Sequence, residues 1–269
     1  LDRLQDMGLV THRRNVAPKG RNTHAQALAI DQLADDPVYQ AADWVLFIDA
    51  DEFLNIHHGA GHLSDLFAVA PQADCFLIHW RLFGTSGRHR FEPGLVTEQF
   101  TRAIALAHRE VPGSFAPKSL FRRSAFLKPG IHRPRGGHQG QRWHDGSGRA
   151  MPDGPARLFS PLGPDNCGLV QLNHYAIGTM EGYLLKCDRG RANRDAAGFD
   201  TGYWVERNFS AVEDRSSLNL DSRAVRAELN ADPELAALHK AAFRWRQMRF
   251  SQMMEEEPWR ALFGRLLLV

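Results

Sequence analysis

The order of apolar and polar residues along the chain predicts a helix followed by a buried strand. Apolar residues recur at helical spacing over residues 25–33, and Thr23 with Gln26 has the form of a capping box at the start of that helix. Residues 44–48 are apolar at every position. Because this run does not alternate between polar and apolar residues, it predicts a strand that is covered on both faces. A helix that leads into such a strand indicates an α/β sheet.

Weaker patterns predict the elements that surround this pair. Several stretches have the composition of short strands: residues 9–16, 75–82, 95–101 and 169–175. A helix is expected over residues 179–193. Residues 128–165 are rich in Gly, Pro, Arg and His and show no periodicity, so we expect long loops there.

The last part of the chain has a helical composition. Asp232 stands before Pro233 as an N-cap residue stands before a proline in the first turn, and Glu257 with Pro258 repeats a similar start. The chain is therefore expected to divide into a first domain, residues 1–195, and a helical C-terminal extension, residues 196–269.

Composition narrows the class of protein. The 269 residues are 43% hydrophobic and 24% charged, which fits a folded globular chain. With 33 basic and 31 acidic residues there is no strong overall field, so nucleic acid is not the expected partner. Three cysteines without CxxC spacing favour a reducing compartment, and we expect a cytoplasmic protein. Apolar runs are too short to cross a bilayer, so membrane contact is expected to be peripheral, at the inner face of the plasma membrane.

Candidate chemistry follows the apolar run directly, at Asp49-Ala50-Asp51. Side chains alternate along a strand, so Asp49 and Asp51 point the same way. Ligands of open α/β sheets collect beyond the carboxyl ends of the strands, where these two acids are expected. Neighbouring carboxylates repel each other unless a cation lies between them, and oxygen ligands suit Mg²⁺ or Mn²⁺. The triplet therefore predicts a metal that can bridge a diphosphate.

Two other interpretations of the triplet stay open on pattern alone. Its acids could simply cap the next segment or solvate the end of a strand. They could also belong to a metal-dependent phosphohydrolase of the haloacid dehalogenase type, with Asp49 as the nucleophile. That pattern requires Thr or Val two residues after the second Asp, where this chain has Phe53. The phosphohydrolase is therefore the less favoured reading.

Residues 44–54, with their Asp-Ala-Asp-Glu-Phe-Leu ending, resemble the Asp-x-Asp segment of family 2-like bacterial glycosyltransferases with the type A fold. Four shorter stretches resemble the same group: residues 79–84, 118–122, 173–175 and 183–186. The resemblance implies a Rossmann-like, mainly parallel sheet flanked by helices. It also implies a metal-dependent, inverting transfer of sugar from a nucleotide-diphosphate donor to a glycan or lipid-linked acceptor. The usual first strand of this fold has no counterpart here, so the expected fold lacks it.

The same resemblance implies roles for the residues of the metal site. Asp49 would contact the nucleotide ribose or a metal-bound water, and Asp51 would coordinate the metal that bridges the diphosphate. His174 matches the place where this fold often supplies a third metal ligand. From the residues alone, a hydrogen-bonded loop histidine is the favoured interpretation of His174.

Basic residues are the candidate partners of the donor phosphates. Lys186 and Arg189 are three positions apart on one predicted helix and share a face, so they could neutralise a diphosphate. The alternative is a solvated basic face. Lys118 and His132 are placed in the same pocket by the resemblance only.

The general base is expected to be a carboxylate that takes the proton of the acceptor hydroxyl. Glu98 and Asp145 lie in stretches that could face the acceptor, and Glu98 is the first choice. Because the first strand has no counterpart, a non-catalytic glycan-binding protein on a decayed transferase fold is a further alternative.

Overall fold

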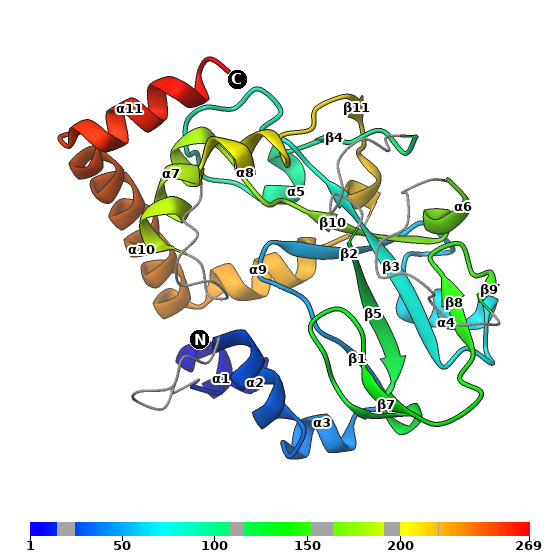
Figure 1. Cartoon of the computed structure of the whole chain (residues 1–269). Coiled ribbons are helices and arrows are strands. Elements are labelled where there is room, and N and C mark those ends of the chain that lie inside the picture. Colours follow the sequence, from blue (N-terminus) through cyan, green and yellow to red (C-terminus); the bar gives the residue numbers. More distant parts are fainter. Residues whose placement is uncertain (15–24, 108–115, 152–163, 191–199, 220) are drawn as a thin grey trace.

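The computed structural model is a mixed α/β fold with a sheet at its centre and helices around it (Figure 1). It describes residues 1–14, 25–107, 116–151, 164–190, 200–219 and 221–269. The helices are α1 (Asp2–Asp6), α2 (Ala25–Leu33), α3 (Pro37–Ala41), α4 (Leu63–Val69), α5 (Val96–Gln99), α6 (Pro164–Cys167), α7 (Met180–Arg189), α8 (Thr201–Val205), α9 (Arg223–Ala231), α10 (Pro233–Met253) and α11 (Glu257–Leu266), with 3₁₀ turns η1 (Arg123–Ala125) and η2 (Ser216–Asn219). The strands are β1 (Trp44–Leu46), β2 (Glu52–Ile56), β3 (Cys75–Leu82), β4 (Arg102–Ala103), β5 (Pro117–Arg122), β6 (Phe126–Lys128), β7 (Arg135–Gly137), β8 (Trp143–Asp145), β9 (Ala150–Met151), β10 (Val170–His174) and β11 (Val212–Glu213).

The main sheet is mixed, with the strand order β1-β5-β3-β10-β2 and with β8 and β9 attached beside β3. β3 pairs in parallel with β10 and β8, whereas the β1–β5, β5–β3, β10–β2 and β8–β9 pairs are antiparallel. The α/β class is therefore confirmed, but the prediction of a mainly parallel sheet is wrong. Strand direction depends on how the connections run, which the apolar pattern does not encode.

The strand that precedes the acidic triplet lies at an edge of the sheet, not at its centre. Among the described strands β1 pairs with β5 alone, and its three residues are half-buried. The Trp44 ring stacks on Phe67 at 4.4 Å, while Val45 packs on the opposite side beside Tyr39. Both faces of β1 are thus apolar because helices cover each of them, and the prediction of a fully buried central strand is wrong.

Most of the other elements agree with the pattern. α2, α7, β3 and β10 confirm the helices and strands expected there, although residues 191–193 lie outside the described residues. Residues 95–101 are not a strand, because the Gln99 and Phe100 amides donate to the Leu95 and Val96 carbonyls and close α5. Residues 9–14 form no strand, and residues 15 and 16 lie outside the described part. The stretch 128–165 holds β7, β8, β9 and the start of α6 as well as loops, with residues 152–163 outside the described part.

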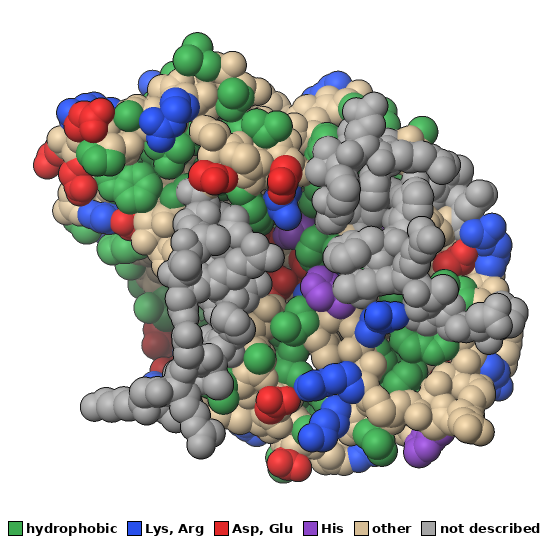
Figure 2. Space-filling model, in the orientation of Figure 1, with side chains coloured by type: hydrophobic (Ala, Val, Ile, Leu, Met, Phe, Trp, Pro, Cys, Tyr) green, Lys and Arg blue, Asp and Glu red, His purple; other side chains and the backbone are tan. Residues whose placement is uncertain are grey.

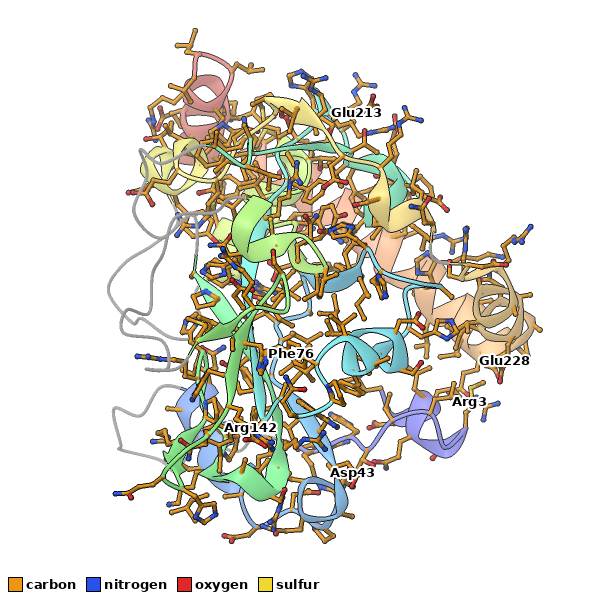
Figure 3. All side chains as sticks on the ribbon, turned by 90° about the vertical axis from the view of Figure 1, so that its right-hand side faces the viewer. Arg3, Asp43, Phe76, Arg142, Glu213 and Glu228 are labelled. Carbon is orange, nitrogen blue, oxygen red and sulfur yellow. The ribbon has the colours of Figure 1, made fainter. Side chains whose placement is uncertain are left out.

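Two apolar cores hold these elements together. One lies between the main sheet and α4 and includes Phe76, which Figure 3 shows in the middle of the sheet. The other joins α7 to the C-terminal helices: it contains Leu184 of α7, Trp204 of α8, Met253 of α10 and Leu262 of α11. The C-terminal segment is mainly helical, and it also supplies β11, which pairs with β4. The proposed boundary at residue 195 stays a prediction.

The predicted helix starts near the C-terminus are confirmed. Asp232 caps α10 by accepting a hydrogen bond from the Leu235 amide at 2.9 Å, and Pro233 occupies the first turn. Pro258 lies in the first turn of α11. Asp232 also forms an ion pair with Arg3, so α1 lies against the start of α10 (Figures 1 and 3). In the described part of the chain no helix is both long and apolar enough to span a bilayer.

Candidate functional site

The loop between β1 and β2 holds the acidic triplet in a fixed turn. The Glu52 amide donates to the Asp49 carbonyl, and the Asp49 amide donates back to the Glu52 carboxylate, both at 3.0 Å. The Asp51 carbonyl accepts a hydrogen bond from the Tyr175 amide at 2.9 Å. The Tyr175 bond ties the loop to the end of β10. Figure 2 shows one face of the molecule, with a hollow in its middle in which histidine, acidic and basic side chains gather.

The Asp49 carboxylate is directed towards β5 and α2. Lys118 on β5 lies 3.2 Å from one oxygen, and the Gln26 side chain donates to the other at 3.0 Å. The Lys118 side chain is fully buried, and its Nζ is also 3.6 Å from the Glu52 carboxylate and 5.0 Å from the centre of the Phe47 ring. One buried ammonium group therefore serves two carboxylates of the same turn.

The Asp51 carboxylate is directed towards α7 and the end of β10. Lys186 Nζ lies 2.8 Å from Oδ2 and also donates to the Ala176 carbonyl at 2.6 Å. His174 Nε2 lies 3.7 Å from Oδ1. Burial opposes ionisation of Asp51, but the nearby His174 and Lys186 outweigh it and lower the pKa of this carboxyl. Asp51 is therefore a carboxylate at neutral pH.

His174 is held neutral by its surroundings. Burial lowers the pKa of this imidazole to about 4, although Asp51 opposes the shift. Its ring lies 4.5 Å from the Trp80 ring, and Nδ1 is buried with no hydrogen-bond partner among the described residues. A neutral imidazole has a lone pair for a cation, which a protonated one lacks.

The gap between His174 Nε2 and Asp51 Oδ1 is large for a hydrogen bond but suits a bridging ion. At 3.7 Å it exceeds the usual donor–acceptor distance, whereas a metal ion about 2.1 Å from each atom spans it. Asp49, the third expected ligand, is turned towards Lys118 instead. In the described residues no group of three or more potential ligand side chains comes together. Mg²⁺ commonly takes only one or two protein carboxylates and completes its shell with phosphates and water.

The structure thus brings five of the predicted residues together in one cluster: Asp49, Asp51, Lys118, His174 and Lys186. His132 lies at the edge of this cluster. Its Nδ1 is 2.9 Å from the Pro117 carbonyl oxygen, and its ring is 5.7 Å from Trp80. Burial lowers the pKa of His132. Arg189 is exposed in the last turn of α7 and makes no hydrogen bond or ion pair with another described residue, so it does not join the cluster.

The two candidate bases lie in different surroundings. Glu98 on α5 forms a 2.9 Å ion pair with Arg226 of α9 and lines a cavity that Asp49 also lines. Asp145 instead accepts hydrogen bonds from the Ser147 and Arg149 amides at 2.9 and 3.0 Å, and pairs with the Arg149 guanidinium. These bonds shape the turn between β8 and β9. They favour a structural role for Asp145.

Two side chains beside the cluster were not among the site residues predicted from the sequence. Gln26 stood out only as a helix-capping residue, yet its amide holds Asp49. Glu52 was a neighbour of the acidic pair, yet it is buried and shares Lys118. Burial raises the pKa of Glu52 to about 7, against the attraction of Lys118. Helical spacing could not mark Gln26, since its partner lies 23 residues further along the chain.

Comparison with known proteins gives no family for this chain. No protein-family model matches it, and no curated protein matches it.

Proposed function

We propose that the chain is a glycosyltransferase whose cluster around Asp49 and Asp51 binds the diphosphate of a nucleotide sugar. The observation that carries the proposal is the gap between Asp51 and His174, beside Lys186. A carboxylate repels a diphosphate unless a cation lies between them. The exposed position of Asp49, at 42% of its side chain, leaves room for a ligand at the loop.

In this proposal Asp51 and His174 would hold Mn²⁺ or Mg²⁺, with phosphate oxygens and water as the other ligands. When bound, the ion would neutralise the charge of the departing diphosphate. Lys186 keeps Asp51 in place and adds a positive charge beside the phosphates. Lys118 offsets part of the charge of Asp49 and Glu52, so that the loop repels the donor less.

The proposed reaction is a single displacement with inversion. The acceptor hydroxyl oxygen forms a bond to the anomeric carbon, the bond from that carbon to the diphosphate oxygen breaks, and the hydroxyl proton passes to a carboxylate. Glu98 is the proposed base, because it lines the cavity that Asp49 also lines. The acceptor is a glycan or a lipid-linked molecule, met in the cytoplasm or at the inner face of the plasma membrane.

Calorimetry with UDP and with GDP, each with and without Mn²⁺, tests the donor half of the proposal. We expect one nucleotide to bind and Mn²⁺ to strengthen the binding. Asp51→Asn should weaken the Mn²⁺-dependent binding at least about tenfold, as removal of a metal ligand or its support does. Asp31→Asn is the matched control, since Asp31 is exposed and pairs with Arg135 outside the cluster.

Absence of metal-dependent binding of either nucleotide to the unmodified chain would contradict the proposal. Incubation with labelled nucleotide sugars and with phosphate monoesters then separates the two enzyme classes. A transferase moves or releases the sugar, whereas a phosphohydrolase releases phosphate from the monoesters.

A further inference from the structure

A cavity of about 900 Å³ borders the acidic loop. Its walls come from the loop before β2, β2 itself, α5, η2 and α9. Asp49, Ala50 and Glu52 line it, whereas Asp51, His174, Lys118 and Lys186 do not. The loop therefore borders both the cavity and the Asp51–His174 pair. Its volume falls in the usual range of sites for small molecules.

The lining is mainly apolar, and much of it is exposed. Four large side chains keep more than a third of their surface accessible: Ile48 at 41%, Phe53 at 38%, Val96 at 38% and Leu218 at 41%. Leu54 and Leu95 also line the cavity. Neighbouring exposed apolar side chains around one hollow are typical of a binding site, because covering them removes apolar surface from water.

The ionisable groups that line the cavity belong to Asp49, to the buried Glu52 and to the ion pair of Glu98 with Arg226. The Asp49 side chain is 42% exposed, and the side chains of the ion pair are 47% and 43% exposed. A free oligosaccharide needs hydrogen-bond partners for many hydroxyl groups. Asn55, Thr97, Ser217 and Ser222 line the cavity and offer some, but most of the lining surface is apolar. A molecule with an apolar chain and one polar head fits this distribution better.

We propose that this cavity binds the acceptor of the proposed transfer, and that the acceptor is amphipathic: an alkyl or isoprenoid-like chain joined to a hydroxyl-bearing head. The chain would lie on Phe53, Val96 and Leu218, and the head beside Asp49 and Glu98. This inference rests on the proposed function, since it gives that function its acceptor class. Among the acceptors considered, it selects the lipid-linked kind over the water-soluble glycan.

Binding of two matched probes tests the inference. Octyl β-glucoside, used below its critical micelle concentration, carries the head and a chain, and methyl β-glucoside carries the head alone. Titration calorimetry of the full chain should show octyl glucoside binding at least about tenfold more tightly than methyl glucoside, because its longer chain buries more apolar surface.

Variants in the cavity locate the site. Val96→Trp fills the cavity and Leu218→Gln removes apolar surface without adding bulk, and each should weaken octyl glucoside binding at least about tenfold. Neither should change Mn²⁺-dependent nucleotide binding, because neither residue touches the Asp51–His174 pair. Val38→Trp is the control, since Val38 is 56% exposed on α3 and does not line the cavity.

Equal binding of the two glucosides, or octyl glucoside binding that survives both variants, would overturn the inference. The proposed function fails separately: octyl glucoside binding that is lost in both variants, in a chain that binds no nucleotide, would leave an apolar-chain site and remove the transferase. Nucleotide binding with no preference for the octyl probe would keep the transferase and remove the amphipathic acceptor.

Discussion

Lys118 is the residue on which the charge balance of the acidic loop depends. Its side chain is fully buried between Asp49 and Glu52, and the Glu52 side chain is also fully buried. Burial of an ammonium group is unfavourable unless carboxylates compensate it, and loss of one partner leaves the other charge unpaired in a site of low dielectric constant. The pair is therefore coupled, and each member is tolerated because of the other.

We expect Lys118→Met to lower the free energy of unfolding by about 3–5 kcal/mol at pH 9, where Glu52 is charged and is left buried without its cation, and by less at pH 6, where Glu52 takes up a proton. Urea unfolding at pH 6 and at pH 9 measures this loss. The double variant Lys118→Met with Glu52→Gln should recover a large part of it, because the unpaired charge is gone. If the single variant is as stable as the unmodified chain, Lys118 is not paired as described.

Residue types alone predicted part of this arrangement. The Asp-Ala-Asp sequence indicated two neighbouring acids, and both lie in the loop that follows β1. This sequence did not indicate that the Asp49 carboxylate turns to Lys118 and the Asp51 carboxylate to Lys186. The directions of the two carboxylates depend on the loop conformation, which Glu52 fixes. The full burial of Lys118 was equally hidden, since it depends on the strands that pair with β5.

At the scale of elements, helix starts were predictable because their signals are local. Asp232 and Pro233 begin α10 by a side chain that caps an amide three residues ahead, which the sequence alone encodes. Strand positions were less predictable. Residues 95–101 carry apolar side chains that suit a strand, yet α5 forms there with Leu95 at its N-cap position. β1 carries apolar side chains on both faces, and α3 and α4 pack against them. This packing is part of the tertiary structure, so the local sequence does not show it.

Asp232→Ala should lower the free energy of unfolding by about 1–2 kcal/mol, because it removes the cap of α10 and the ion pair with Arg3. Urea unfolding followed by far-UV circular dichroism measures the effect. Glu92→Ala is the matched control: Glu92 is exposed, pairs with Arg88 four residues away and should change stability by less than about 0.5 kcal/mol. Equal losses in the two variants would show that the cap contributes nothing of its own.

At the scale of the whole molecule, the candidate site is assembled from parts far apart in sequence. The loop before β2 supplies the acids, β5 supplies Lys118, the end of β10 supplies His174 and α7 supplies Lys186. The residue pattern singled out Asp49, Asp51 and Lys186, and the resemblance to type A glycosyltransferases added Lys118 and His174. The structure brings these residues together. The mixed strand directions of the sheet could not be predicted, since they follow from crossovers between distant segments.

The position of Lys186 ties the site to the C-terminal helices. α7 packs its Leu184 and Tyr183 into the core that also contains Leu262 of α11, so the helix that carries Lys186 depends on residues near the C-terminus. Leu262→Ala should lower the free energy of unfolding by about 2–5 kcal/mol, as truncation of a buried leucine does. Leu267→Ala, at a residue that is 54% exposed, should cost less than about 0.5 kcal/mol.

Hydrogen exchange measured peptide by peptide in rising urea shows whether this dependence reaches α7. Peptides from α7 and from α11 should be deprotected together in the unmodified chain, and Leu262→Ala should shift both by the same free energy, because a shared core unfolds as one unit. Faster exchange in α10 and α11 alone, with α7 unchanged, would instead mean that residues 196–269 unfold as a separate extension. In that case Lys186 would keep its place beside Asp51 without the C-terminal helices.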